Sequence, residues 1–182
     1  MDRELSTDQL RIINCDLPMI ETLLRSDAEL ALYLVIDVPS GWTEFGAPIF
    51  QYTLARLKEF PSDAQWWTWL PVLRSENELV GSCGFKGKPN ANGEVELGYE
   101  IAASRRKLGL GTEAALALRD FAFGHPEVKK VIAHTLAENN PSTRILEHCG
   151  MAKVAELVDP EDGPIWRWEI DRQTYLNGGA RR

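Results

Sequence analysis

The chain has 182 residues, and 20 Lys+Arg against 27 Asp+Glu give it a formal charge of −7 and a pI near 5.1. Hydrophobic residues make up 44% of the sequence, which is enough for one continuous core and argues against a disordered chain. The acidic balance disfavours nucleic acid as a partner, because phosphate backbones attract proteins with a basic excess. It mildly favours cationic partners such as amines.

The N-terminal sequence and the hydropathy favour a cytoplasmic protein. The start, Met1-Asp2-Arg3-Glu4, has neither the basic nor the apolar region of a secretory signal. No apolar run approaches the roughly 18 residues of a membrane span, so we expect no membrane partner. The cysteines at 15, 83 and 149 lack metal-ligand or redox spacing, which predicts free thiols and no metal site.

The first third of the chain is predicted to be helical. Apolar residues recur at helical intervals in 17–24 and 28–35, and less regularly in 45–60. The breaker cluster Pro39-Ser40-Gly41-Trp42 predicts a loop between the last two segments. Such a loop can hold a substrate, although a tryptophan there more often covers the core.

From residue 66 the pattern changes to strands. Segments 66–74 and 78–86 predict an antiparallel hairpin, and Asn92-Gly93 predicts a tight turn into a strand over 94–101. Side chains alternate along that strand, so one face carries Val95, Leu97, Tyr99 and Ile101, and the other carries Glu94, Glu96, Gly98 and Glu100. We expect this second face, the acidic face, to lie in solvent or in a cleft.

The rest of the chain predicts a helix over 111–123, a buried strand over 131–137 and a short helix over 141–149 that Asn139 or Asn140 can cap. A hairpin over 151–158 and 165–170 follows, and 177–182 is expected to be a flexible tail. The order predicts an α/β (α+β) fold in a single domain, 1–182, with a mixed, mostly antiparallel central sheet flanked by helices.

A glycine-rich segment, Arg106-Lys107-Leu108-Gly109-Leu110-Gly111-Thr112, lies between a predicted strand and a predicted helix. A helix N-terminus offers unpaired N–H groups and the positive end of the helix dipole, so it can hold an anion. Glycines let the backbone approach a phosphate closely. The segment matches neither the P-loop motif nor the dinucleotide-binding fingerprint. It therefore predicts either a site for another pyrophosphate ligand or an ordinary turn with solvated basic residues.

Three segments resemble a known family. Arg106-x-x-Gly109-x-Gly111 resembles the pyrophosphate-binding signature of the GNAT N-acetyltransferases, and 96–101 resembles the splayed central strand of that fold. The stretch 139–151 resembles the RimJ/RimL-like branch, and the resemblance covers about 79–151. It implies transfer of an acetyl group from acetyl-CoA to a primary amine, either a protein N-terminal α-amine or a small molecule, by direct attack in a ternary complex. It is compatible with a monomer or a homodimer.

The resemblance also implies a set of acetyl-CoA-binding residues: Ile101, Arg106, Lys107, Leu108, Gly109, Leu110, Gly111, Thr112 and Asn139. Asn139 would hold the pantetheine arm through its amide, although capping of the helix explains it equally well. An alternative function is a non-catalytic acyl-CoA-binding module that has kept the cofactor cleft. Retention of a hydroxyl and several acids favours the enzyme.

Departures from the family pattern decide the expected catalytic residues. Many members carry a tyrosine as general acid where this chain has Leu146, so the resemblance implies that Ser142 protonates the leaving thiolate. A helix-start hydroxyl is the alternative role for Ser142.

A base is expected from the acidic face of the strand. Glu96 is the first candidate, Glu100 the second and Glu161, in the terminal hairpin bend, the third. We expect Glu96 and Glu100 to raise each other's proton affinity, since like charges in a desolvated cleft disfavour ionisation. A solvated carboxylate or a base acting through water remains open, and His125 and His134 are interpreted as structural.

Overall fold

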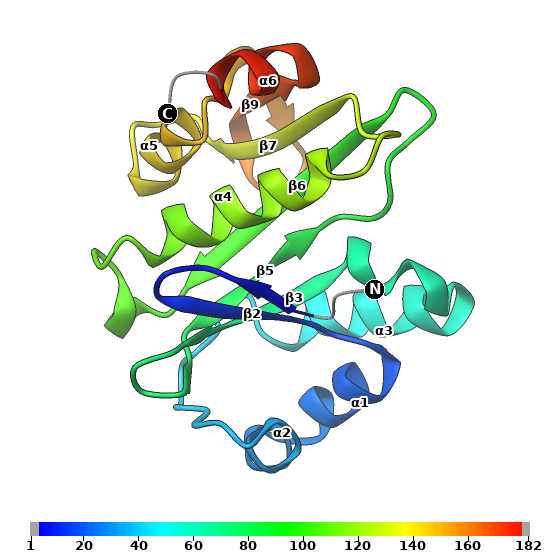
Figure 1. Ribbon diagram of the computed structural model, residues 1–182, viewed down its shortest axis with the longest axis vertical. Coiled ribbons are helices and arrows are strands. Elements are labelled where there is room, and N and C mark those ends of the chain that lie inside the picture. The colour runs from blue at the N-terminus through cyan, green and yellow to red at the C-terminus, as the bar shows by residue number, and fades with distance from the viewer. Residues whose placement is uncertain (1–3, 180–182) are drawn as a thin grey trace.

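The computed structural model describes residues 4–179 (Figure 1), and over that range it contains one nine-stranded sheet flanked by helices. The strands are β1 (Glu4–Ser6), β2 (Leu10–Asn14), β3 (Thr68–Leu73), β4 (Glu78–Leu79), β5 (Gly81–Phe85), β6 (Glu94–Ile101), β7 (Lys130–Leu136), β8 (Ala152–Asp159) and β9 (Gly163–Asp171). The helices are α1 (Leu17–Arg25), α2 (Asp27–Leu34), α3 (Ala47–Glu59), α4 (Leu110–Phe123), α5 (Pro141–His148) and α6 (Arg172–Gly179), with short 3-10 helices η1 (Pro61–Trp66) and η2 (Ala103–Arg105).

The sheet runs in the order β1-β2-β3-β5-β6-β7-β9-β8, with β4 paired to β3. Neighbouring strands are antiparallel except for β6 and β7, which are parallel. The predicted fold class and the helix and strand assignments from residue 17 to the terminal hairpin are therefore confirmed. The helical prediction for the first third was incomplete, because β1 and β2 precede α1 and extend the sheet.

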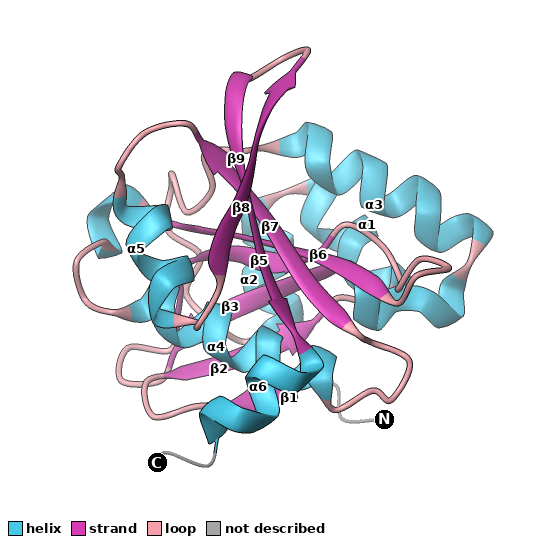
Figure 2. Cartoon of the chain, turned by 90° about the horizontal axis from the view of Figure 1, so that it is seen from above, coloured by secondary structure: helices cyan, strands magenta, loops and turns pink. Residues whose placement is uncertain are grey.

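Two groups of buried residues cover the two faces of the sheet, and Figure 2 shows α3 and α4 on opposite sides of the strands. The apolar side chains of β6 and β7, such as Leu97 and Val131, pack with the buried residues of α4. The N-terminal helices α1 to α3 pack against the other face of β3. This arrangement places the acidic face of β6 on the α3 side of the sheet.

The parallel strands β6 and β7 separate along their length. Within the described residues they pair only over Glu94–Glu96 and Lys130–Ile132. Beyond that point β6 continues to Ile101 on β5 alone, and β7 continues to Leu136 on β9 alone. We call this divergence the splay. It opens the middle of the sheet to both layers, as the resemblance implied.

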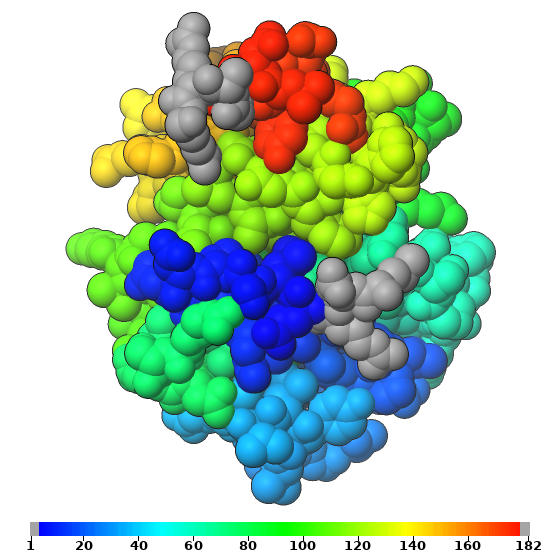
Figure 3. Space-filling model, viewed as in Figure 1, coloured from blue at the N-terminus to red at the C-terminus, as the bar shows by residue number. Residues whose placement is uncertain are grey.

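The β1–β2 turn is bound to the start of α4, and Figure 3 shows the two segments side by side on the surface. The Glu113 carboxylate in the first turn of α4 accepts hydrogen bonds from the hydroxyl of Thr7, the backbone and side chain of Gln9 (2.7 and 2.9 Å) and the backbone of Leu10 (3.2 Å). Burial alone raises the pKa of Glu113, but these hydrogen bonds outweigh it and lower the pKa. The N-terminal strands thus buttress the helix that follows the glycine-rich loop.

The C-terminal segment is helical where a flexible tail was expected. Helix α6 includes residues 177–179, so that part of the prediction was wrong, while 180–182 lie outside the described residues. The Arg172 guanidinium donates to the carbonyls of Phe123, Val128 and His125 at 2.9, 2.9 and 2.6 Å, and the Tyr175 ring stacks on Phe123. These contacts dock α6 on the end of α4.

Several side chains singled out in the sequence belong to the core. Trp42 is buried, and its indole donates to Asp27 at 3.0 Å, so the loop tryptophan covers the core. Cys15, Cys83 and Cys149 are buried free thiols, as predicted. No helix within residues 4–179 has the length and apolar character needed to span a membrane.

Candidate active site

The predicted cofactor loop leads into the N-terminus of α4. The N-cap is Gly109, with φ +81°, and it supplies no side-chain cap to the first turn. The first intrahelical bond runs from the Glu113 N–H to the Gly109 carbonyl, so the earlier N–H groups of α4 point out of the helix start. Lys107 also has a positive φ, +68°. The loop therefore presents backbone donors in the arrangement that binds anions.

Gly109 and Gly111 in the loop are glycines for different structural reasons. A Cβ on Gly109 would meet no atom within 4 Å, so this residue is required by its backbone angle. A Cβ on Gly111 would lie 3.0 Å from Ile145 Cδ1 and 3.5 Å from Ile101 Cγ1. Gly111 therefore allows α4 to pack closely on α5 and β6, which is a structural reason for the glycine in addition to the predicted close approach of a phosphate.

Arg106 links the cofactor loop to two other segments. Its Nε donates to the Ile101 carbonyl at 3.0 Å, at the end of β6, and its guanidinium pairs with the Glu44 carboxylate at 2.5 Å. Lys107 and Leu108 lie exposed beside it. The end of β6, the loop before α3 and the start of α4 are thus held together at one end of the splay.

Glu100, the second candidate base, is a buried anchor of the loop before α3. One carboxylate oxygen accepts from the hydroxyls of Thr43 (2.6 Å) and Ser82 (2.7 Å), and the other from the N–H groups of Glu44 (2.8 Å) and Phe45 (3.2 Å). Its oxygens are committed to four donors of the protein itself. The geometry assigns Glu100 to loop positioning.

Glu96 lies at the vertex of the splay, where β6 last pairs with β7. Its Oε1 contacts the Lys86 ammonium at 2.5 Å and His134 Nδ1 at 3.0 Å. Burial opposes ionisation, but the hydrogen bonds and charges of Lys86 and His134 outweigh it and lower the pKa of Glu96. The expectation that Glu100 raises the proton affinity of Glu96 was wrong, because Lys86 and His134 contact the Glu96 carboxylate directly and Glu100 is bound to other donors.

The strand position between the two carboxylates of the acidic face has no side chain. Gly98 stands between Glu96 and Glu100, and a Cβ placed on it would meet nothing within 4 Å. On one side of Gly98, Glu100 holds the loop before α3, and on the other side Glu96 contacts Lys86 and His134. Glu161 lies exposed in the β8–β9 bend, where its N–H donates to Asp159 at 2.8 Å.

Ser142 lies on the other side of the splay, in the first turn of α5. Asn140 caps this helix in a capping box with Thr143. Of the two caps that the sequence allowed, Asn139 is therefore not the one used, and Asn139 lies exposed. The Tyr99 hydroxyl reaches from β6 to the Ser142 carbonyl at 3.2 Å. Burial raises the pKa of Tyr99, so the hydroxyl keeps its proton and donates. Sequence reasoning had assigned Tyr99 only to the apolar face.

The site residues therefore form two groups that meet at the splay. The α4 N-terminus and Ser142 lie on one side of the sheet, while Glu96, Lys86 and His134 lie on the other. Since the divergence of β6 and β7 connects the two sides, a ligand anchored on α4 can present its end to a second molecule that approaches the acidic face. This geometry suits transfer of a group between two bound molecules.

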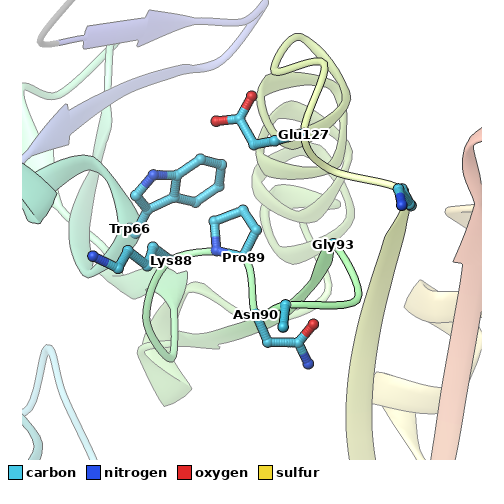
Figure 4. Close-up of a pocket in the computed structure, with 8 residues that line it drawn as sticks. Trp66, Lys88, Pro89, Asn90, Gly93 and Glu127 are labelled. Atoms are coloured by element: carbon cyan, nitrogen blue, oxygen red, sulfur yellow. The ribbon is translucent and has the colours of Figure 1, made fainter.

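A separate cavity of about 400 Å³ lies outside this site (Figure 4). Figure 4 shows Trp66, Lys88, Pro89 and Asn90 on one part of its wall and Glu127, from the segment between α4 and β7, on another. None of the residues expected to bind cofactor or to act in catalysis lines it. The cavity therefore does not contribute to the arrangement around the splay.

Comparisons with known proteins agree with the geometry. A family model described as an acetyltransferase (GNAT) domain matches residues 11–152. The uncharacterized N-acetyltransferase YjdG of Bacillus subtilis is 29% identical over 153 residues, which is 80% of this chain and 88% of that protein. The family model alone covers well over half of the chain, including the splay and both groups of site residues.

Solved structures share the fold at low sequence identity. The ribosomal-protein-S5-alanine acetyltransferase of Vibrio fischeri superposes with a TM-score of 0.69 at 13% identity, covering 93% of this chain and 97% of its own. The spermidine N-acetyltransferase of Vibrio cholerae, solved with CoA and spermine, gives 0.66 at 18% identity, covering 94% and 100%. Taken with the family match, the loop at α4 and the splay identify the chain as a member of the GNAT family of acetyltransferases, acetyl-CoA-dependent acyltransferases.

Proposed function

We propose that this acetyltransferase transfers the acetyl group of acetyl-CoA to a primary amine by direct attack in a ternary complex. The observation that carries the proposal is the splay, which places Ser142 and the α4 N-terminus on one side of the sheet and Glu96 on the other. Two molecules bound on opposite sides can then meet in the plane of the sheet. The buried cysteines offer no exposed nucleophile for a covalent intermediate.

The donor set at α4 fits a pyrophosphate. The exposed N–H groups at the start of α4 would receive the phosphates, Lys107 supplies a nearby positive charge, and Asn139 would reach the pantetheine arm. The uncapped Gly109 leaves these backbone donors available. When bound, acetyl-CoA supplies the acetyl group as an activated thioester.

Glu96 and Ser142 would act at the reacting end. The pKa of Glu96 is lowered, so the residue is an anion at neutral pH and suits the attraction and orientation of the acceptor ammonium. Its Oε1 is occupied by Lys86 and His134, and within residues 4–179 Oε2 has no hydrogen-bond donor. Ser142, held by Tyr99 through its carbonyl, would donate a proton to the departing sulfur.

The acceptor belongs to the classes that the RimJ/RimL-like resemblance implies: a protein N-terminal α-amine or a small-molecule amine. The structural neighbours include enzymes named for a ribosomal protein and for spermidine, which supports both classes. Release of free thiol from acetyl-CoA, measured with a panel of such amines, tests the proposal. Binding of CoA without amine-dependent thiol release would instead indicate the non-catalytic module.

A substitution at Gly109 tests the cofactor site. Gly109→Ala is expected to weaken CoA binding by roughly tenfold or more, which is the loss expected for one hydrogen bond to a charged group. The reason is that alanine disfavours the positive φ at this position, so the backbone N–H donors would turn away from the phosphates. Gly163→Ala is the matched control, because Gly163 also has a positive φ, +73°, and open space around a Cβ. Both variants carry a similar backbone cost of about 1–2 kcal/mol. Calorimetry that finds equal CoA affinities in the two would contradict the assignment.

A substitution at Ser142 tests the acid. Ser142→Ala is expected to fold normally and to lower kcat by about 10²-fold or less, since water can also protonate a thiolate. Folding is preserved because Tyr99 contacts the backbone carbonyl of Ser142 and not its hydroxyl. Steady-state rates from about pH 6 to 9 provide the measurement. Wild-type rates throughout would reduce Ser142 to a helix-start residue.

A further inference from the structure

The pair formed by Glu96 and His134 goes beyond the sequence interpretation, in which His134 was structural. Glu96 Oε1 and His134 Nδ1 lie 3.0 Å apart, across the vertex of the splay. An ionised carboxylate only accepts hydrogen bonds, so Nδ1 must carry the hydrogen. In the neutral imidazole the lone pair then resides on Nε2. The contact with Glu96 therefore fixes a tautomer that offers a proton acceptor.

The register places this imidazole beside the open position of Gly98 on the acidic face. Glu96 pairs with Ile132, and His134 is two residues further along the parallel strand, which brings it level with Gly98 across the splay. The space above Gly98 is open. Because Nδ1 faces Glu96, an amine nitrogen in this space would meet Nε2 on the ring edge away from that contact.

We propose that His134 is the base of this reaction, with Nε2 taking a proton from the acceptor ammonium while Glu96 orients the ring through Nδ1 and attracts the ammonium by its charge. The inference rests on the proposed function. The ammonium loses one proton to Nε2 and becomes a nucleophilic amine. As its nitrogen bonds to the acetyl carbon, the C–S bond breaks, the nitrogen releases its second proton and the sulfur takes one up. His134 then returns its proton to solvent.

The charged groups around His134 are consistent with a base there. Lys86 contacts the same Glu96 oxygen and supplies the positive charge that balances the carboxylate. Arg167 of β9 is the cross-strand neighbour of His134, and it is engaged by Glu169 and Glu94 at 2.7 and 3.3 Å. Asp159, at the end of β8, interacts electrostatically with Lys86 and His134. Histidine is the side chain that enzymes use most often for general acid–base catalysis.

His134→Asn is the decisive variant, because the asparagine amide nitrogen replaces Nδ1 and keeps a donor to Glu96, while nothing replaces Nε2. It is expected to lower kcat by about 10²–10⁴-fold and to abolish the near-neutral acidic limb of the pH–rate profile. CoA affinity should be unchanged. His148→Asn, at an exposed position in the last turn of α5, is the control and should behave as wild type.

Two results would overturn the proposal. The first is a His134→Asn enzyme with wild-type kcat and an intact acidic limb, which would leave the proposed acetyl transfer standing while removing His134 from it. The second needs no turnover: ¹⁵N NMR of the full-length protein should show the neutral His134 ring protonated on Nδ1, and protonation on Nε2 would exclude the base. Absence of amine-dependent thiol release in the wild type, with CoA bound, would refute the proposed function itself.

Discussion

Glu100→Ala is expected to lower the free energy of unfolding by about 3 kcal/mol or more, which corresponds to a fall in Tm of roughly 6–12 °C for a chain of this size. The buried carboxylate accepts from two hydroxyls and two backbone N–H groups, and an alanine leaves all four without their acceptor. Because two of these donors are the backbone N–H groups of Glu44 and Phe45, the loop before α3 should also lose its attachment to β6. Thermal unfolding and the acceptor KM measure the two effects.

The amide variant separates hydrogen bonding from charge at this position. Glu100→Gln retains one oxygen for the two N–H groups, and its NH₂ can donate to the hydroxyls of Thr43 and Ser82, so its loss of stability should be clearly smaller. Glu147→Ala, at an exposed position on α5, is the control for removal of a carboxylate. Equal Tm values for Glu100→Ala and this control would show that Glu100 does not anchor the loop.

The parts of the fold that the sequence predicts are those with local signals. The alternation of carboxylates and apolar residues along β6 placed Glu96 and Glu100 on one face, and the glycine-rich loop marked the start of α4. The Asn–Pro sequence before α5 likewise predicted a capped helix. Each of these signals reports the backbone geometry of a few adjacent residues, so no tertiary contact is needed to interpret it.

Elements that depend on distant partners were missed. Strands β1 and β2 are three and five residues long, and β2 owes its place to pairing with β3, more than 50 residues later. The polar α6 carries no strong helical pattern and is docked by Arg172 on carbonyls around the end of α4. Such contacts override weak local propensity.

The chemistry of the site was predictable in its residue types and less so in its pairings. Glu96 and His134 lie 38 residues apart, and only the parallel register of β6 and β7 brings them together. Lys86 follows β5, and it reaches Glu96 because β5 and β6 are neighbours. The sequence therefore suggested mutual repulsion between Glu96 and Glu100, while the fold gives each carboxylate separate donors that determine its role.

Glu96→Gln is expected to lower kcat/KM for the amine by about 10²-fold or more while the near-neutral acidic limb of the pH–rate profile remains. The glutamine has no charge to hold the acceptor ammonium, and its amide holds the His134 ring less firmly in the tautomer that exposes Nε2. The limb persists because it does not come from Glu96. The pKa of Glu96 is lowered, so the wild-type carboxylate is ionised across the neutral range, and its protonation would affect rates only below its usual pKa of 4.5. Glu94→Gln, on the same face but engaged by Arg167 and Lys130, is the matched control and should remain close to wild type. A Glu96→Gln enzyme that loses the limb, beside a His134→Asn enzyme that keeps it, would return the role of base to the carboxylate.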